Sequence, residues 1–409
     1  MKSMNQHRYR NLKLNNEYDT HDPDAQKHLE LPFLKRRSKV VEIVAAKDIV
    51  FALTHSGICA AFSRQTNKRM CFLNVRSDEV IRSLFYNKNN DSLITVSVYG
   101  QDNFSSLKCR STPMEYIRRR NPADGFTLFE KESLRWPGFV EFDDVNGKVL
   151  TYSAQDQVYK VFDLKNYNHL YSISDKDVQE IKISPGIMLL IYERKGNQVP
   201  LEVMSIEDGK KLKSFNHQLA KNKKLEFIEQ FNEKLLVKQE GLCLQIVDIC
   251  TTEMISVSKF LTPDAFIFLY ENQLFLTFKK NTVQVWNFKG DLVTSFDDHE
   301  LRYRGCNTNN IYITSEQDHI ISYCQDGSQA DNESFVVGSI NISNIHTGKR
   351  IAKITRENGV DRHPLKSGAA DGNERVTRAL KDVTSLFYDE ERNEIFTGSR
   401  SGLVHVWAH

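Results

Sequence analysis

The chain has 409 residues, of which 40% are hydrophobic and 26% are charged, and this balance excludes a mainly disordered protein. Its 55 basic and 53 acidic residues leave a net charge of +2, which provides no general attraction to nucleic acid or to anionic lipid. No apolar run approaches the roughly 20 residues of a membrane-spanning helix, so we expect no contact with a membrane.

The seven cysteines are odd in number and include no C-x-x-C pair. A disulfide framework or a structural zinc site is therefore not expected, and the cysteines indicate a reducing compartment, the cytoplasm or the nucleus. Residues 1–10 are basic and polar with no apolar stretch after them, which is not the pattern of a secretory signal.

Residues 1–37 form a polar N-terminal segment with one candidate strand, at residues 11–15 or 28–33. The basic run at the end of this segment consists of Lys35, Arg36, Arg37 and Lys39. Short basic runs serve as nuclear import signals, and they also occur as solvated flanks of strands, so the sequence leaves both interpretations open.

From residue 38 onward, strand-length apolar runs alternate with turns rich in Gly, Asn and Asp. In the first unit, residues 41–45, 50–54 and 58–62 are predicted strands, and residues 69–73 add a fourth. β-branched and aromatic residues at alternate positions, as in residues 282–286, indicate half-buried strands. Many short strands at even spacing are typical of a sandwich, a barrel or a propeller.

A comparison of the chain with itself narrows this choice. Residues 83–100 and 385–402 have the same length, and seven of their eighteen positions are identical without a gap. Both segments contain a strand beginning Ser-Leu-Phe-Tyr, a polar turn, a second strand and a turn that ends in Gly. The shared turn length indicates a structural repeat.

The same order of strands recurs in eight units, which predicts an all-β fold, a closed propeller of four-stranded antiparallel blades, with seven blades as the alternative. The last unit ends at Trp407 and leaves no chain for a fourth strand. A strand from residues 1–37 would complete this blade, because closing the ring removes the exposed edges. Two stretches, at about 101–135 and 357–381, break the rhythm and are predicted to be insertions into the propeller domain, residues 38–409.

Two connections carry side chains that suit protein recognition. Arg302, Tyr303 and Arg304 precede the seventh unit, and exposed aromatic and Arg residues on loops make binding hot spots. Trp136, in the sequence Trp-Pro-Gly, is predicted to anchor the start of the third unit, with a contact at one face of the ring as the alternative.

Two predicted third strands end in Trp, with Val-Gln-Val-Trp-Asn at residues 283–287 and Val-His-Val-Trp at residues 404–407. Val-Phe-Asp at residues 161–163 and Ile-Val-Asp at residues 246–248 have Phe and Val in the Trp position. In these motifs and in its strand order, the chain from about residue 38 resembles the WD-repeat β-propeller family. The resemblance implies a rigid, non-catalytic scaffold whose loops and rims bind other proteins in a multiprotein complex.

One of these motifs suggests a more specific function. Trp286-Asn287-Phe288-Lys289 is similar to the Trp-Asp-x-Arg/Lys sequence of WD propellers that act as substrate receptors of cullin–RING ubiquitin ligases. The resemblance implies adaptor binding through Trp286 and Lys289. The alternative is an ordinary unit end, in which Trp286 packs between neighbouring sheets.

Six lysines surround one predicted outer strand and the loop after it, namely Lys210, Lys211, Lys213, Lys221, Lys223 and Lys224. An anion-binding patch of this kind is suited to the phosphates of a nucleic acid or to an acidic partner. Acidic residues lie close by in the sequence, and an edge strand protected by lysines is the other interpretation.

Catalysis is not expected, because the chain contains no G-x-S-x-G, P-loop, H-E-x-x-H or dinucleotide-binding glycine pattern. No cofactor and no metal are predicted either. We therefore predict a non-catalytic protein-interaction scaffold in the nucleus or the cytoplasm. The alternatives are a nucleic-acid or chromatin-associated factor that binds through the lysines, and a cullin–RING substrate receptor.

Overall fold

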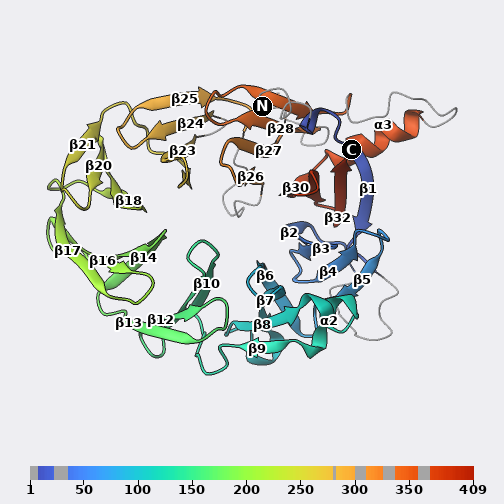
Figure 1. Ribbon diagram of the computed structural model, residues 1–409, viewed down its shortest axis with the longest axis horizontal. Coiled ribbons are helices and arrows are strands. Elements are labelled where there is room, and N and C mark those ends of the chain that lie inside the picture. The colour runs from blue at the N-terminus through green and yellow to red at the C-terminus, as the bar shows by residue number, and fades with distance from the viewer. Residues whose placement is uncertain (1–7, 23–35, 280–281, 300–309, 326–336, 358–368) are drawn as a thin grey trace.

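The structure of the chain is a computed structural model, which describes residues 8–22, 36–279, 282–299, 310–325, 337–357 and 369–409. Its strands form eight antiparallel sheets of four strands each, and the sheets stand as blades around a common axis (Figure 1). The predicted all-β propeller with eight blades is therefore confirmed.

We number the blades 1 to 8 in the order of their innermost strands. Blades 1 and 2 consist of β2 (Val40–Ala46), β3 (Ile49–Thr54), β4 (Cys59–Ser63) and β5 (Arg69–Phe72), and of β6 (Glu79–Asn87), β7 (Ser92–Tyr99), β8 (Lys108–Pro113) and β9 (Phe126–Leu128). Blades 3 and 4 consist of β10 (Phe139–Asp143), β11 (Lys148–Ser153), β12 (Val158–Asp163) and β13 (His169–Ser174), and of β14 (Val178–Ser184), β15 (Ile187–Tyr192), β16 (Gln198–Ser205) and β17 (Lys211–Gln218).

Blades 5 and 6 consist of β18 (Leu225–Phe231), β19 (Lys234–Gln239), β20 (Leu244–Asp248) and β21 (Met254–Val257), and of β22 (Ala265–Leu269), β23 (Leu274–Lys279), β24 (Thr282–Asn287) and β25 (Leu292–Phe296). Blade 7 consists of β26 (Ile311–Ile313), β27 (His319–Gln325), β28 (Gly338–Asn344) and β29 (Arg350–Ile354). Blade 8 consists of β30 (Val383–Asp389), β31 (Glu394–Ser399), β32 (Leu403–Ala408) and β1 (Lys13–Asp19).

Blade 8 is built from both ends of the described chain. β1 pairs in antiparallel register with β32, from Lys13 opposite Ala408 to Asp19 opposite Leu403. The predicted closure by an N-terminal strand is thus confirmed, and β1 overlaps the first of the two predicted segments, residues 11–15. The second predicted segment, residues 28–33, lies outside the described residues.

The sequence repeat corresponds to the inner hairpins of blades 2 and 8. In each hairpin a tyrosine hydroxyl donates a hydrogen bond to the turn, from Tyr86 to Asp91 Oδ1 at 2.8 Å and from Tyr388 to Asn393 Oδ1 at 2.9 Å. Asp91 and Asn393 adopt left-handed φ values of 51° and 54°, which Asp and Asn tolerate better than most residues. An equivalent tyrosine hydrogen bond therefore holds a turn of the same length in both hairpins.

The stretch at residues 101–135 is not an insertion into the ring. It contains β8 and β9, the third and fourth strands of blade 2, with the short helix α2 (Met114–Arg118) between them. β8 escapes a pattern search because its buried residues include Arg110, Ser111 and Thr112. Arg110 Nη2 donates to the Leu73 carbonyl, and Ser111 Oγ donates to Ser92 Oγ at 2.8 Å, so polar side chains take buried positions here and the usual hydrophobic alternation is missing.

The second predicted insertion, residues 357–381, is described again from residue 369, where α3 (Ala369–Ala379) begins. Val376 and Leu380 belong to the apolar core shared by blades 7 and 8. The Leu380 carbonyl accepts a hydrogen bond from the Tyr323 hydroxyl at 2.7 Å. The described part of this stretch therefore packs as part of the ring.

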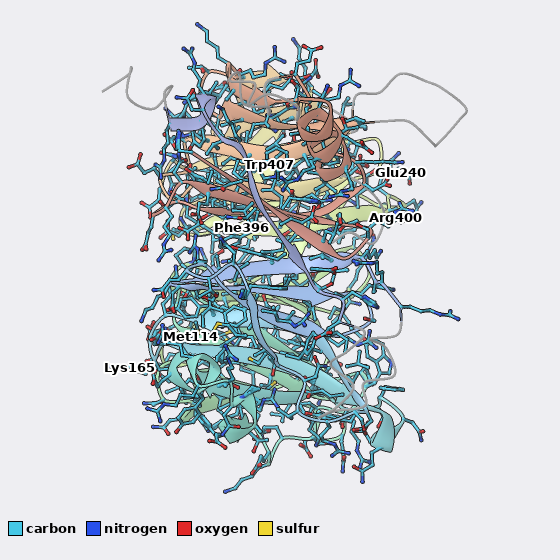
Figure 2. All side chains as sticks on the ribbon, turned by 90° about the vertical axis from the view of Figure 1, so that its right-hand side faces the viewer. Met114, Lys165, Glu240, Phe396, Arg400 and Trp407 are labelled. Carbon is cyan, nitrogen blue, oxygen red and sulfur yellow. The ribbon has the colours of Figure 1, made fainter. Side chains whose placement is uncertain are left out.

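Connections between strands lie on two faces of the ring. On the face that we call the loop face, the fourth strand of each blade connects to the next blade, and the second strand turns into the third. On the opposite face, the turn face, the first strand turns into the second and the third into the fourth. Figure 2 views the ring from its edge, with Lys165 and Met114 on the turn face at the left and Glu240 and Arg400 on the loop face at the right.

Apolar side chains fill the spaces between neighbouring blades. One such cluster joins Phe231 and Leu236 of blade 5 to Phe275 and Trp286 of blade 6. Burying one aliphatic or aromatic side chain contributes about 1.5–3 kcal/mol relative to leaving it in water. The rigidity of the ring therefore depends on contacts between blades, and this ring positions the loops of both faces.

Candidate protein-binding face

Many polar side chains on the turn face are used by the turns themselves. Asp248 ends β20, and its Oδ1 accepts hydrogen bonds from the backbone N–H groups of Cys250 and Thr251, both at 2.8 Å. Lys234 also donates to this carboxylate, and these hydrogen bonds lower the pKa of Asp248 to about 2. The same kind of turn follows the third strands of blades 3 and 6, at Asp163 and Asn287.

The residues of the predicted ligase motif have structural roles in blade 6. Trp286 is only 3% exposed, and its Nε1–H donates to Thr277 Oγ1 at 3.2 Å. Asn287 Oδ1 accepts the backbone N–H of Lys289 at 3.0 Å, so Asn replaces Asp in the turn without loss of the hydrogen bond. The Lys289 side chain is exposed on the turn face. Trp286 thus packs between sheets, which is the alternative interpretation of this motif.

The six lysines do not form one patch. Lys210, Lys211 and Lys213 lie where β17 begins, near the turn face, whereas Lys221, Lys223 and Lys224 follow its end, on the loop face. β17 has eight residues and spans about 25 Å. The predicted anion-binding patch is therefore divided into two groups at opposite faces, because residues close in sequence are carried apart by an extended strand.

Lysines of the first group have partners. Lys210 forms an ion pair with Asp208, and Lys211 with Glu202, both at 2.6 Å. These contacts raise the pKa of Lys210 and of Lys211, and the hydrogen bond from Lys210 is the main reason that the pKa of Asp208 falls to about 2. Lys213 donates to a backbone carbonyl of the next blade at 3.2 Å. This group fits an edge strand protected by lysines.

The second group is exposed and makes no ion pair with any described residue. Arg194, in the turn between β15 and β16, donates from Nη1 to the Lys223 carbonyl oxygen at 3.5 Å, which brings a further cation to this group. Glu240, in the turn between β19 and β20, lies beside it, since its N–H donates to the Lys224 carbonyl at 2.9 Å. The basic cluster of the loop face consists of Arg194, Lys195, Lys221, Lys223 and Lys224.

The predicted binding loop, Arg302, Tyr303 and Arg304, lies outside the described residues. So does Lys35, the first residue of the predicted import signal. Of the predicted import signal, Arg36 and Lys39 are exposed. Arg37 donates two hydrogen bonds to the Asp19 carboxylate, at 2.8 and 2.6 Å, which hold it against β1. The nuclear import signal and the binding loop at residues 302–304 stay predictions.

Trp136 is 85% exposed, the highest value among the large apolar residues that the structure describes. It lies on the loop face, in the connection between β9 and β10. The prediction that its ring packs as an anchor is therefore wrong. The reason is that the backbone, rather than the ring, fastens this connection to blade 2. The alternative, a contact at one face of the ring, stays a prediction.

Backbone contacts hold the Trp136 loop in place. The N–H of Trp136 donates to the Ser105 carbonyl at 2.9 Å, and the Leu134 carbonyl accepts a hydrogen bond from Leu107 at 3.0 Å. A Cβ at Gly138 would lie 2.7 Å from a backbone oxygen of the same loop, so the chain can pass there only as glycine. The exposed indole thus projects from a fixed support.

Phe104 lies in the adjoining loop between β7 and β8, and it is 48% exposed. Its backbone N–H donates to the Tyr99 carbonyl at 2.9 Å, and its φ of 59° turns the chain sharply at this point. Because Ser105 is bonded to Trp136, the two exposed aromatic residues lie on adjoining backbone. We call Phe104 and Trp136 the aromatic pair.

Three exposed cations flank the aromatic pair along the chain, and we call them the cationic rim: Lys108 at the start of β8, and Lys131 and Arg135 in the connection between β9 and β10. Within the part of the chain that the structure describes, none of them has an ion pair. Loop-borne aromatic and Arg side chains of this kind provide apolar area and hydrogen-bond donors at once, which suits protein recognition.

Among the described residues, no group of three or more His, Cys, Asp or Glu side chains is arranged to hold a metal ion. Nor does any described helix have the length and apolar character needed to cross a membrane.

Comparisons with other proteins place the chain in one family and support its fold. The sequence model of a family described as a domain of unknown function (DUF7899) matches residues 1–407. No curated protein matches the chain. Among solved structures, the chain is similar to the computationally designed Ika8 protein, at 17% identity and a TM-score of 0.51, over 93% of this chain and 98% of that one. It is also similar to BamB from Moraxella catarrhalis, at 12% identity and a TM-score of 0.43, over 97% and 98%.

Sequence reasoning missed most of the candidate face. Phe104, Arg135 and Arg194 were not selected, because their significance depends on contacts between loops that are far apart along the chain. The sequence did contain one signal for this face, the Trp-Pro-Gly sequence at Trp136. A tryptophan that lies in a long connection and directly precedes a proline has few neighbours along the chain to pack against. This signal identified Trp136 but did not predict whether its side chain would be buried or exposed.

Proposed function

Because this chain belongs to the DUF7899 family, whose description gives no activity, we propose its function from the geometry. The protein is a non-catalytic scaffold that binds another protein through the loop face of its eight-bladed ring. The ring supplies a stiff frame, and the loops between blades supply the contact surface. A multiprotein complex is the setting in which such a frame is useful.

The exposure of Trp136 carries this proposal. Tryptophan combines a large apolar area with one N–H donor, and it is among the residues most enriched in binding hot spots. Leaving it 85% exposed keeps that area in contact with water until a partner covers it. Since hydrogen bonds already hold the loop, a partner would meet little ordering cost on binding.

Affinity purification of the tagged full-length protein from cells, followed by mass spectrometry, tests the proposal. We expect a recurrent partner that is lost in Trp136→Ala. The matched control is Leu261→Ala, because Leu261 is also exposed, at 63%, in the loop-face connection between β21 and β22. A partner set that is identical in the wild type and in Trp136→Ala would contradict the proposal.

We also propose that the family is a divergent branch of the WD-repeat propellers. Two features support this relationship. Trp286 and Trp407 each donate an indole hydrogen bond to a threonine of the neighbouring strand, at 3.2 and 2.9 Å. In addition, Asp or Asn is the last residue of the third strand and caps the next turn, as at Asp163, Asp248 and Asn287.

A second candidate function is the binding of nucleic acid through the basic cluster. The observation that favours it is the exposure of Lys221, Lys223 and Lys224 without an ion pair to the described part of the chain. Charge reversal of these three lysines is expected to abolish binding of a labelled single-stranded oligonucleotide. That binding should fall steeply as salt rises. Equal loss on charge reversal of Lys210 and Lys211, at the other face, would show that only net charge matters.

A further inference from the structure

The chemistry around the aromatic pair indicates which kind of partner it would bind. Resting on the proposed function, we propose that the loop-face partner is an acidic peptide segment with an apolar side chain that packs against Trp136 and Phe104.

The side chains of the cationic rim carry hydrogen-bond donors that have no acceptor among the described residues. Lys108, Lys131 and Arg135 are exposed and lie close in sequence to the aromatic pair, and no described residue forms an ion pair with them. Arg135 directly precedes Trp136, so its guanidinium and the indole are presented by adjacent residues of one fixed loop. A guanidinium favours planar, bidentate acceptors such as a carboxylate.

Carboxylates of these loops already have partners of their own. Glu132 forms an ion pair with Lys160 at 2.6 Å. Asp102 accepts a hydrogen bond from the Ser106 hydroxyl, and Glu130 accepts one from the Thr127 hydroxyl. None of these carboxylates forms an ion pair with a cation of the rim, and carboxylate side chains of a partner would supply the rim with acceptors.

The neighbouring blade argues for a peptide rather than a nucleic acid. Between the aromatic pair and the basic cluster, the loop-face turns of blade 3 carry Asp156, Asp175 and Asp177. A phosphate backbone that followed the loop face from one group of cations to the other would pass these carboxylates. A short acidic segment bound at the aromatic pair alone avoids them, and its apolar residue has an aromatic surface to cover.

A peptide library tests this inference. Random peptides displayed on phage would be selected on the full-length wild type and on Trp136→Ala. The recovered peptides should be rich in Asp and Glu around one aromatic, aliphatic or proline residue. Their affinity should fall about 30-fold or more in Trp136→Ala, as expected for a hot-spot residue. The double charge reversal Lys131→Glu with Arg135→Glu should weaken binding about 5- to 20-fold.

The outcomes separate this inference from the proposed function. Peptides that need Trp136 but are neutral or basic, or that are unaffected by the charge reversal, would overturn the acidic partner while the scaffold remains. Saturable binding of single-stranded oligo(dT) that is tighter than the binding of the peptides and is lost in Trp136→Ala would also overturn the acidic partner. If no peptide depends on Trp136 and its substitution leaves the cellular partners unchanged, both proposals fail. Unchanged unfolding midpoints would show that the variants, all at exposed positions, are folded.

Discussion

Trp136 on the loop face is 85% exposed, whereas Trp286 inside blade 6 is 3% exposed and Trp407 inside blade 8 is fully buried. The two buried rings donate their indole hydrogen bonds to threonines and lie in apolar clusters between sheets. The exposed ring has no such surroundings, and its loop is fastened by backbone contacts instead. The comparison shows how the same residue type supports the frame in one region and offers a contact surface in another.

The largest expected effect on stability comes from replacing one of the two buried tryptophans. Trp286→Ala removes a ring from the cluster between blades 5 and 6, and we expect it to lower the free energy of unfolding by about 3–5 kcal/mol. Chemical denaturation followed by circular dichroism measures this loss. Trp286→Phe is the control, since it keeps most of the apolar volume and loses the hydrogen bond to Thr277. A loss below about 1 kcal/mol for Trp286→Ala would break the comparison.

Glu42 extends the comparison to ionisable side chains. It lies on β2 and accepts a backbone hydrogen bond from Leu84, and burial raises its pKa to about 7. The folded state favours the neutral carboxyl. The contribution of Glu42 to the free energy of unfolding is therefore complete below about pH 4.5 and is lost as the pH rises through about 7. We expect Glu42→Gln to remove a pH-dependent loss on the order of 2–3 kcal/mol.

Denaturation midpoints measured from pH 4.5 to pH 8 check this sign. The matched control is Glu240→Gln, because Glu240 is exposed on the loop face and its removal should leave the pH profile unchanged. A wild-type profile that does not decline over this range, or a Glu42→Gln profile with the same slope, would contradict the expectation.

A smaller effect is expected at the turn face. Asp248→Ala removes the acceptor of two backbone N–H groups and of Lys234, and we expect a loss of about 1 kcal/mol. Asp248→Asn keeps the acceptor oxygen for the turn and should cost less, as Asn287 does in the corresponding turn of blade 6. Thermal unfolding distinguishes the two variants. Equal losses would mean that the charge, rather than the turn, is what matters.

The smallest effect on stability is expected at Trp136. Trp136→Ala should change the free energy of unfolding by no more than about 0.5 kcal/mol, because the ring covers little of the protein. In fluorescence, acrylamide should quench the wild type strongly and Trp136→Ala weakly, since Trp286 and Trp407 are shielded. Strong quenching that persists in Trp136→Ala would contradict the exposed position.

Local sequence patterns were sufficient to predict the ring. Strand alternation, turn residues and the repeat around Tyr86 and Tyr388 depend on neighbours within a few residues, and seven of the eight blades are built from consecutive strands. β8 was missed because Arg110, Ser111 and Thr112 are buried although they are polar, so the strand lacks the apolar alternation by which a strand is predicted. Such burial depends on partners elsewhere in the fold, which a pattern search does not see.

The candidate face was predictable only in part, for a related physical reason. Lys210 and Lys224 are close in sequence, yet β17 carries them to opposite faces. Arg194 and Lys223 belong to different connections, yet the fold brings them into hydrogen-bond contact. A contact surface at one end of a ring collects residues from many blades, so proximity along the chain is a poor guide to its membership.

The pairing of β1 with β32 also has a consequence for the timing of synthesis. Ala408 is translated after Lys13 and all of the strands between them, so at typical elongation rates roughly 20–80 s separate the two strands. During that interval β1 has no partner of its own, and any earlier strand edge is a competitor for it. The charges of Lys13, Glu17 and Asp19 disfavour such premature pairing. Blade 8 can therefore be completed only after β32 has been synthesised, and the rate of translation sets this delay.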